Sequence, residues 1–265
     1  MRWRPLSRPG LLTDRVMRLY LIALQFLTII PLPFDTRCQK DDLGRSTALF
    51  PLVGLTIGAL LVGLNWLLAP WLTRPLCDAL LVTALASVTG GLHLDGLADV
   101  CDGLAARGGR ERFLAVMKDS QVGAIGAVGL VLGLLLKWQA LTALPVHLKW
   151  QALLLFPALA RFGQVLMMTG ARHARQDGLG IIFVQGTSTV GMAISLITAA
   201  SASFFLLGVH GIVVLSAVCL LTAAGRFFFQ KRLGGITGDT LGCLNELNEI
   251  LTLIGISIVA QLTIS

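Results

Sequence analysis

The chain has 265 residues, of which 55% are hydrophobic and only 13% are charged. Soluble domains carry about 25% charged residues, so this composition excludes an ordinary soluble enzyme and predicts a polytopic membrane protein. Backbone exposed to lipid must satisfy its own hydrogen bonds, which favours an all-α helical bundle. The net charge of +7 is explained by the basic loops that membrane proteins keep in the cytoplasm, and attraction of an anionic substrate is compatible with the same charge.

The amino-terminal region is expected to have two parts. The stretch MRWRPLSRPG is basic and lacks the small-residue cleavage site of a secretory signal, so residues 1–18 are predicted to form a basic cytoplasmic extension. Residues 19–265 are predicted to form a single membrane-embedded catalytic domain. Its first apolar segment, 19–33, is stopped early by Pro31 and Pro33 and is shorter than the roughly 20 residues that span a bilayer. We therefore expect an interfacial or re-entrant helix there.

The later apolar segments predict about six membrane-spanning helices. They lie at 46–69, 76–92, 121–144, 151–169, 187–208, 211–225 and 249–264. Lys and Arg residues are concentrated in the connecting regions 93–120, 170–186 and 226–248, whereas only Arg74 and Lys149 remain for the opposite side. The positive-inside rule then places the three regions in the cytoplasm. Motifs within them can therefore contribute to one site at the cytoplasmic face.

The stretch GGLHLDGLADVCDGLAARGG, residues 90–109, gathers acids in a chain that otherwise avoids charge. Asp95, Asp99 and Asp102 have the spacing i, i+4, i+7, which puts them on one face of a helix. Three carboxylates on one face repel each other unless a cation holds them, and Mg²⁺ is commonly bound by carboxylates together with substrate phosphates. A solvated helix end is the alternative, but acids near membrane depth are costly and tend to be functional. We predict that these residues are catalytic and bind the metal.

His93 precedes this acidic cluster and is a candidate general base or a group that orients a carboxylate, with a structural histidine as the alternative. Several other residues are candidates for binding an anionic substrate because they combine charge or hydroxyl groups with glycine-rich turns or apolar surroundings. These are Arg107, Lys118, Asp119, Arg161, Arg175, Asp239, Thr240 and Glu246. The alternatives are a helix cap for Asp119, a basic cytoplasmic flank for Arg175, and a capped amphipathic helix for the last three residues.

Part of the acidic motif resembles the signature of the CDP-alcohol phosphotransferases. Residues 99–107 match its first half, D-x2-D-G-x2-A-R. The second half is missing, because Val116 stands where glycine is expected and Asp119 is out of register. The match indicates related chemistry without membership of that family.

Six blocks together resemble the cobalamin synthase family, the adenosylcobinamide-GDP ribazoletransferases. In chain order from Leu24 to Leu247 they are LQFLTIIPLPF, FPLVGLTIGALLVG, TGGLHLDGLADVCDGL, MKDSQVGAIGAVGL, ARHARQDGLG and GGITGDTLGCLNEL. The resemblance implies that a hydroxyl group of α-ribazole, or of its 5′-phosphate, attacks the phosphate attached to adenosylcobinamide and that GMP leaves. It also implies a Mg²⁺ requirement and a place in the bacterial inner membrane among lipids. Possible partners are a second copy or other late cobalamin-pathway enzymes, and nucleic acid is not expected.

The resemblance also suggests roles for particular residues. Asp95, Asp99 and Asp102 would hold the metal, and His93 or one of these acids would deprotonate the alcohol. Arg107, Lys118 and Arg175 are the residues expected to bind phosphates.

Two other functions are weighed against this transferase. A corrinoid transporter would use intramembrane acids and broken helices, but the acids cluster in one predicted interfacial loop and no internal repeat is visible. A lipid synthase of the CDP-alcohol type lacks half of its signature here.

Overall fold

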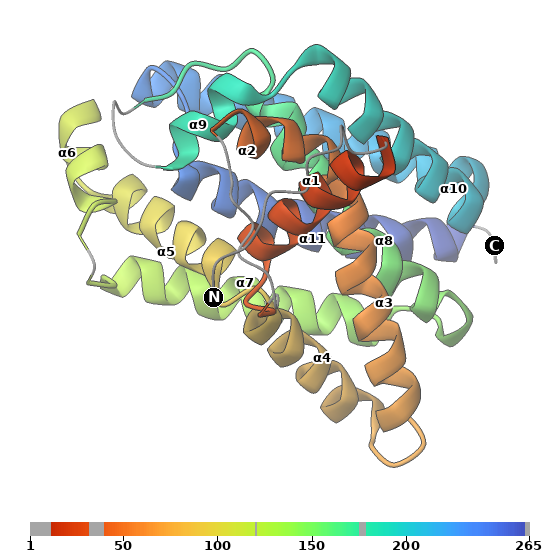
Figure 1. Cartoon of the computed structure of the whole chain (residues 1–265). Helices are drawn as coiled ribbons and strands as arrows, with labels where there is room; N and C mark the ends of the chain where they lie inside the picture. Colours follow the sequence, from red (N-terminus) through yellow and green to blue (C-terminus); the bar gives the residue numbers. More distant parts are fainter. Residues whose placement is uncertain (1–11, 32–39, 120, 175–178, 263–265) are drawn as a thin grey trace, which may run out of the picture.

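The computed structural model describes residues 12–31, 40–119, 121–174 and 179–262. Within these ranges the chain is built from α-helices and two short 3-10 turns, and the only β-type pairing is one isolated bridge. The helices are α1 (Leu12–Leu27), α2 (Lys40–Ser46), α3 (Phe50–Leu68), α4 (Arg74–Val88), α5 (Leu92–Ala105), α6 (Arg110–Val116), α7 (Ala124–Ala143), α8 (Lys149–Met168), α9 (Leu179–Gly186), α10 (Thr189–Leu233) and α11 (Gly238–Leu262) (Figure 1). The predicted all-α class is confirmed.

Five helical segments of the described chain are long and apolar enough to cross a membrane, or six if the pair α4 and α5, bent by 90°, counts as one span. One of the five, α10, is itself folded back. Gly208 has φ 60° and ψ −141° inside it, and a Cβ atom on Gly211 would overlap the carbonyl oxygen of Ser203. The two limbs of α10 therefore correspond to the separate predicted segments 187–208 and 211–225. The polytopic helical membrane fold is confirmed.

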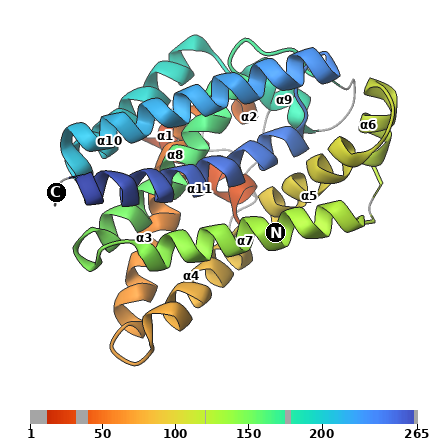
Figure 2. The same ribbon diagram turned by 180° about the vertical axis from the view of Figure 1, so that it is seen from behind.

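Helix α8 lies at the centre of the bundle. It contacts α3, α10 and α11, and most of its residues are buried. In Figure 2, α11 runs between α10 on one side and the pair α5 and α7 on the other. Gly54 lets α3 approach α8 so closely that a Cβ there would lie 2.5 Å from the Cα of Ala158. Small residues at helix crossings are the usual means of close packing in membranes, where apolar burial alone does not drive association.

The two ends of the bundle carry different polar groups. At one end, Lys149 donates a hydrogen bond to Asp78, and the guanidinium of Arg74 lies 3.9 Å from the same carboxylate. At the other end, Arg226 donates to the carbonyl oxygen of Thr169 at 2.6 Å, just beyond α8. Because α8 has 20 residues and so runs for about 30 Å, the two groups are separated by a bilayer's hydrocarbon thickness. The two residues predicted for the far side, Arg74 and Lys149, lie together there.

The three predicted cytoplasmic regions meet at the other end. Arg110 donates from Nε to the carbonyl oxygen of Leu233 at 2.6 Å and from a terminal nitrogen to that of Ala174 at 2.8 Å. The amide of Ala174 donates to the carbonyl oxygen of Ile236 at 2.8 Å, and the amide of Ile236 to that of Arg172 at 2.8 Å. One arginine and one short backbone bridge thus join the regions 93–120, 170–186 and 226–248.

The amino-terminal helix α1 is not among the helices that qualify as spans within the described chain. Arg18 on it forms an ion pair of 3.0 Å with Asp42 of α2. The amide of Ile29, beyond its end, donates to the carbonyl oxygen of Val88 at 2.8 Å, where α4 ends. Helix α1 begins at Leu12, so the boundary predicted after residue 18 falls inside a continuous helix; residues 1–11 lie outside the described ranges.

Candidate active site

The site begins at the break between α4 and α5. Gly90 and Gly91 have φ angles of 61° and 70°, in the left-handed region that side chains with a Cβ rarely adopt. These two residues produce the 90° bend that turns α5 away from the line of α4. Helix α4 covers only 15 residues, and just after the bend the side chain of His93 on α5 is buried.

Helix α5 then packs tightly against the start of α11. A Cβ atom on Gly96 would lie 2.6 Å from the carbonyl oxygen of Asp239, and one on Gly242 would lie 3.3 Å from the Cα of His93. Two glycines facing each other therefore bring the acidic motif of α5 against the Asp239 turn. This contact joins two blocks that are far apart in the sequence.

We expect Gly96→Val to separate α5 from α11 and to lower stability by about 1–3 kcal/mol, as overpacking commonly does. The midpoint of thermal unfolding in detergent and the amount of protein in membranes measure this effect. Gly63→Val on α3 is the matched control, because a Cβ at that position meets nothing within 4 Å. Equal midpoints for the two variants would contradict the close contact.

A cavity of about 280 Å³ opens where these elements meet. Its wall includes His93 and Asp95 from α5 and Asp239 from α11. The other residues that line it are Phe26, Phe50, Leu92, Gln164, Met168, His173, Gly180, Phe183, Thr237, Gly238, Leu241 and Gly242. We call it the central cavity. Of the sequence-predicted site residues, it brings together His93, Asp95 and Asp239.

A second cavity of about 590 Å³ lies beside the helix break. It shares Phe26, Leu92 and Asp95 with the central cavity and is otherwise lined mostly by apolar groups, among them Ile29 and Leu130. Asp95 is exposed and lies on the wall of both cavities. A carboxylate in this position is accessible to a substrate from either side.

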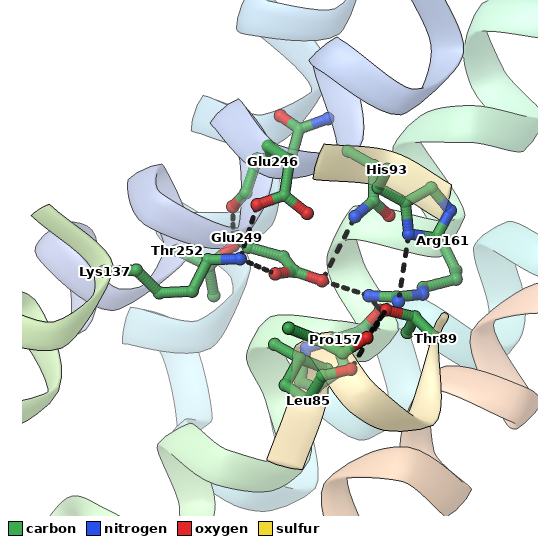
Figure 3. A network of polar contacts seen from close by, with 12 residues as sticks. Leu85, Thr89, His93, Lys137, Pro157, Arg161, Glu246, Glu249 and Thr252 are labelled. Atoms are coloured by element: carbon green, nitrogen blue, oxygen red, sulfur yellow. Dashed lines mark hydrogen bonds and ion pairs between the residues drawn. The ribbon is translucent and has the colours of Figure 1, made fainter. Parts of the chain in front are cut away.

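Behind the central cavity lies a buried network of charges (Figure 3). Lys137 of α7 donates to Glu246 at 2.6 Å and to Glu249 at 2.5 Å. Arg161 of α8 is fully buried and donates to the other oxygen of Glu249, and one of its terminal nitrogens lies 3.4 Å from Nδ1 of His93. Two cations thus face two carboxylates, which offsets the cost of burying each charge.

This network contains two residues that the sequence predicts to bind substrate. Arg161 and Glu246 were expected to bind substrate, but both are buried, pair with protein charges and are not among the residues of the central cavity wall. A charge in the bundle interior needs a partner that is always present, and here other helices supply it. Glu246 and Glu249 thus add buried acids in the interior to the aspartates of the α5 motif.

The three aspartates of α5 do not form one cluster. Asp102 accepts hydrogen bonds of 2.7 Å from the amides of Gly123 and Gly126 and so caps the start of α7. Asp99 is half-buried and is not among the residues lining either cavity. Among the described residues no group of three His, Cys, Asp or Glu side chains is close enough to hold a metal ion. The seven-residue offset from Asp95 to Asp102 corresponds to about 10 Å of helix rise, so a shared face does not mean a shared ion.

The remaining candidates lie elsewhere. Arg107, Lys118 and Asp119 are exposed in the connection from α5 to α7 and are not part of the central cavity wall. Asp119 accepts a hydrogen bond of 3.1 Å from the amide of Gln121 in the turn before α7, whereas the start of α7 itself is capped by Asp102. Thr240 is buried and holds the turn before α11 by accepting from the amide of Thr237 at 2.9 Å. Arg175 lies outside the described residues.

Comparison with known proteins identifies the family. The family model described as cobalamin-5-phosphate synthase matches residues 19–257. The chain belongs to this family.

The relatives of this family member align with it over most of its length. An adenosylcobinamide-GDP ribazoletransferase of Geotalea daltonii is 58% identical over 238 residues, covering 90% of this chain and 96% of the relative. A protein of the same name from Klebsiella pneumoniae is 37% identical and covers 91% of this chain and 100% of the relative. Another from Clostridium botulinum is 33% identical and covers 87% of this chain and 94% of the relative. No solved structure matches.

Some residues in or next to the central cavity of this family member were not singled out from the sequence. Lys137 is a single charge inside an apolar helix, so the same criterion that selects Arg161 could have found it. Gln164 carries no such signal, because an uncharged amide in an apolar segment is unremarkable until the fold shows that it lines the cavity. The aromatic wall of Phe26, Phe50 and Phe183 also depends on contacts between distant segments.

Proposed function

We propose that this chain transfers the adenosylcobinamide phosphate group from adenosylcobinamide-GDP to α-ribazole or its 5′-phosphate, releasing GMP. The observation that carries the proposal is the central cavity, where His93, Asp95 and Asp239 from two family motifs share one wall. The hydroxyl oxygen of the ribazole forms a bond to the phosphorus next to the corrinoid, and the bond from that phosphorus to the GMP oxygen breaks. The hydroxyl proton passes to a carboxylate of the same cavity.

We also propose that Mg²⁺ serves this reaction. Asp95 and Asp239 would hold it, since both are oxygen donors on one cavity wall. Two carboxylates suit an ion that is typically bound through one or two such groups together with substrate phosphates. When bound, the ion neutralises charge on the phosphates. The aromatic side chains Phe26, Phe50 and Phe183 form an apolar part of the cavity wall and would limit competition by water with the ribazole hydroxyl.

An assay of GMP release tests the reaction. The purified protein in liposomes receives adenosylcobinamide-GDP with and without α-ribazole, and nucleotide and corrinoid products are separated by chromatography. We expect GMP and a new corrinoid only when both substrates are present. In a parallel sample with CDP-diacylglycerol and an alcohol acceptor, we expect no CMP, and CMP release there would instead support the CDP-alcohol class.

We propose that the protein lies in the bacterial inner membrane with the end that carries Arg107 in the cytoplasm. The basic residues gathered at that end support this orientation. In a background without cysteine, a cysteine at exposed position 107 should react with an impermeant maleimide only after spheroplasts are permeabilised. A cysteine at Val146, which is 78% exposed near the other end of α8, should react in intact spheroplasts. The reverse labelling pattern would contradict the orientation.

Association with other late cobalamin-pathway enzymes stays a prediction.

A further inference from the structure

His93 belongs to the acidic motif of α5 and also lines the central cavity. It is only 3% exposed and lines the cavity together with Asp95 and Asp239. Its Nε2 atom has no hydrogen-bond partner in the described part of the protein. A buried ring nitrogen without a partner is costly, so it indicates that a group from outside the chain completes the contact.

The other ring nitrogen reveals which kind of contact this is. Nδ1 of His93 lies 3.4 Å from a terminal nitrogen of Arg161. A guanidinium group has five N–H donors and no acceptor, so Nδ1 must be the acceptor in this pair. An imidazole that accepts at Nδ1 carries its proton on Nε2.

The position of Arg161 is itself well defined. Its guanidinium is fully buried and donates to Glu249, which also accepts from Lys137 and, at 3.1 Å, from the side-chain amide of Asn245. Figure 3 shows this chain of contacts leading from Lys137 through Glu249 and Arg161 to His93. The buried network therefore holds the histidine ring in one orientation and one tautomer, as partners behind a functional histidine commonly do.

We propose that His93 presents a fixed Nε2–H donor to an anionic phosphate oxygen of the bound substrate and does not take the proton of the attacking hydroxyl. This inference rests on the proposed function for the identity of the substrate and replaces the alternative of His93 as general base. A diphosphate linkage is the matching ligand because its oxygens only accept hydrogen bonds. A donor that is oriented before the reaction stabilises charge on such an oxygen without reorganisation.

Three variants distinguish a donor from a base. In His93→Gln the side-chain amide nitrogen takes the place of Nε2–H. The shorter amide in His93→Asn reaches only the place of Nδ1. His93→Ala removes both ring nitrogens. We expect His93→Gln to keep GMP release within about tenfold of the unaltered protein, and His93→Asn and His93→Ala to lose at least about a hundredfold, the scale for one lost oxyanion donor. Equal losses in all three variants, in protein of unchanged thermal midpoint, would overturn the donor role. His147→Gln is the matched control, since His147 is exposed near the other end of α8.

A spectroscopic measurement tests the tautomer in the unaltered protein without relying on turnover. Histidine labelled with ¹⁵N at both ring nitrogens is incorporated into the unaltered protein in lipid, and the signals of His93 are assigned by their loss in His93→Gln. Protonated and unprotonated ring nitrogens resonate in separate regions. We expect a protonated Nε2 and an unprotonated Nδ1; the opposite tautomer or a doubly protonated ring would overturn the proposal. If the unaltered protein released no GMP, the proposed function would fail while the tautomer measurement still stood.

Discussion

Glu249→Gln is expected to destabilise the protein more than any other single change of one carboxylate to its amide. Glu249 is 1% exposed and accepts hydrogen bonds from both Lys137 and Arg161. Without its charge, two buried cations share the single carboxylate of Glu246. Removing one partner of a buried ion pair typically costs about 3–5 kcal/mol, because the remaining charge stays desolvated and uncompensated. The thermal unfolding midpoint and the yield of protein in membranes measure this loss.

Two further variants sharpen that result. Glu111→Gln makes the same chemical change at an exposed position on α6 and should leave the midpoint unchanged. Combining Glu249→Gln with Lys137→Met restores the charge balance, so the double variant should recover part of the stability lost by the single one. A midpoint for Glu249→Gln equal to that of Glu111→Gln would show that the network does not stabilise the fold.

Asp95→Asn is expected to lower turnover at least about a hundredfold, the scale for removing one group that stabilises the transition state. Asp95 is exposed and lines both cavities, so the fold should tolerate the substitution. If this carboxylate helps to hold Mg²⁺, the variant should also need more Mg²⁺ to reach half of its maximal rate. GMP release measured across a Mg²⁺ titration gives both quantities.

Asp102→Asn makes the same change two turns further along α5 and is the matched comparison. Asp102 accepts from the amides of Gly123 and Gly126, so this variant should lose stability through a weakened cap at the start of α7, by about 1 kcal/mol. Its Mg²⁺ requirement should stay unchanged. A larger shift in Mg²⁺ requirement for Asp102→Asn than for Asp95→Asn would return the metal to the aspartate set predicted from sequence.

Much of the fold could be predicted from local patterns. Apolar segments separated by short polar regions predicted the helices, and the interruption between 208 and 211 coincides with the reversal at Gly208 in α10. The distribution of Lys and Arg predicted which connections meet at one end, because charge placement relative to a membrane is a property of each loop by itself. The family blocks likewise lie in the sequence and are confirmed by the family match over residues 19–257.

The site was predicted less completely, because helical periodicity states which residues share a face but not what that face contacts. The spacing of Asp95, Asp99 and Asp102 correctly places them on one helix, α5. Their different surroundings depend on neighbouring helices: α7 supplies amides to Asp102, whereas α11 brings Asp239 to the cavity that Asp95 lines. The same limit applies to Arg161 and Glu246, whose partners lie on α11 and α7.

The sequence by itself therefore determined the helical membrane class, the grouping of polar regions at one end, and the family. Each of these follows from composition, charge or the order of motifs along the chain. Only the tertiary structure decided that His93, Asp95 and Asp239 line one cavity, that Arg161 and Glu246 pair with protein charges, and that Asp102 caps α7. The physical reason is that a buried charge is functional or structural according to whether protein groups already neutralise it. Those groups come from helices that are distant in the sequence and adjacent in the bundle.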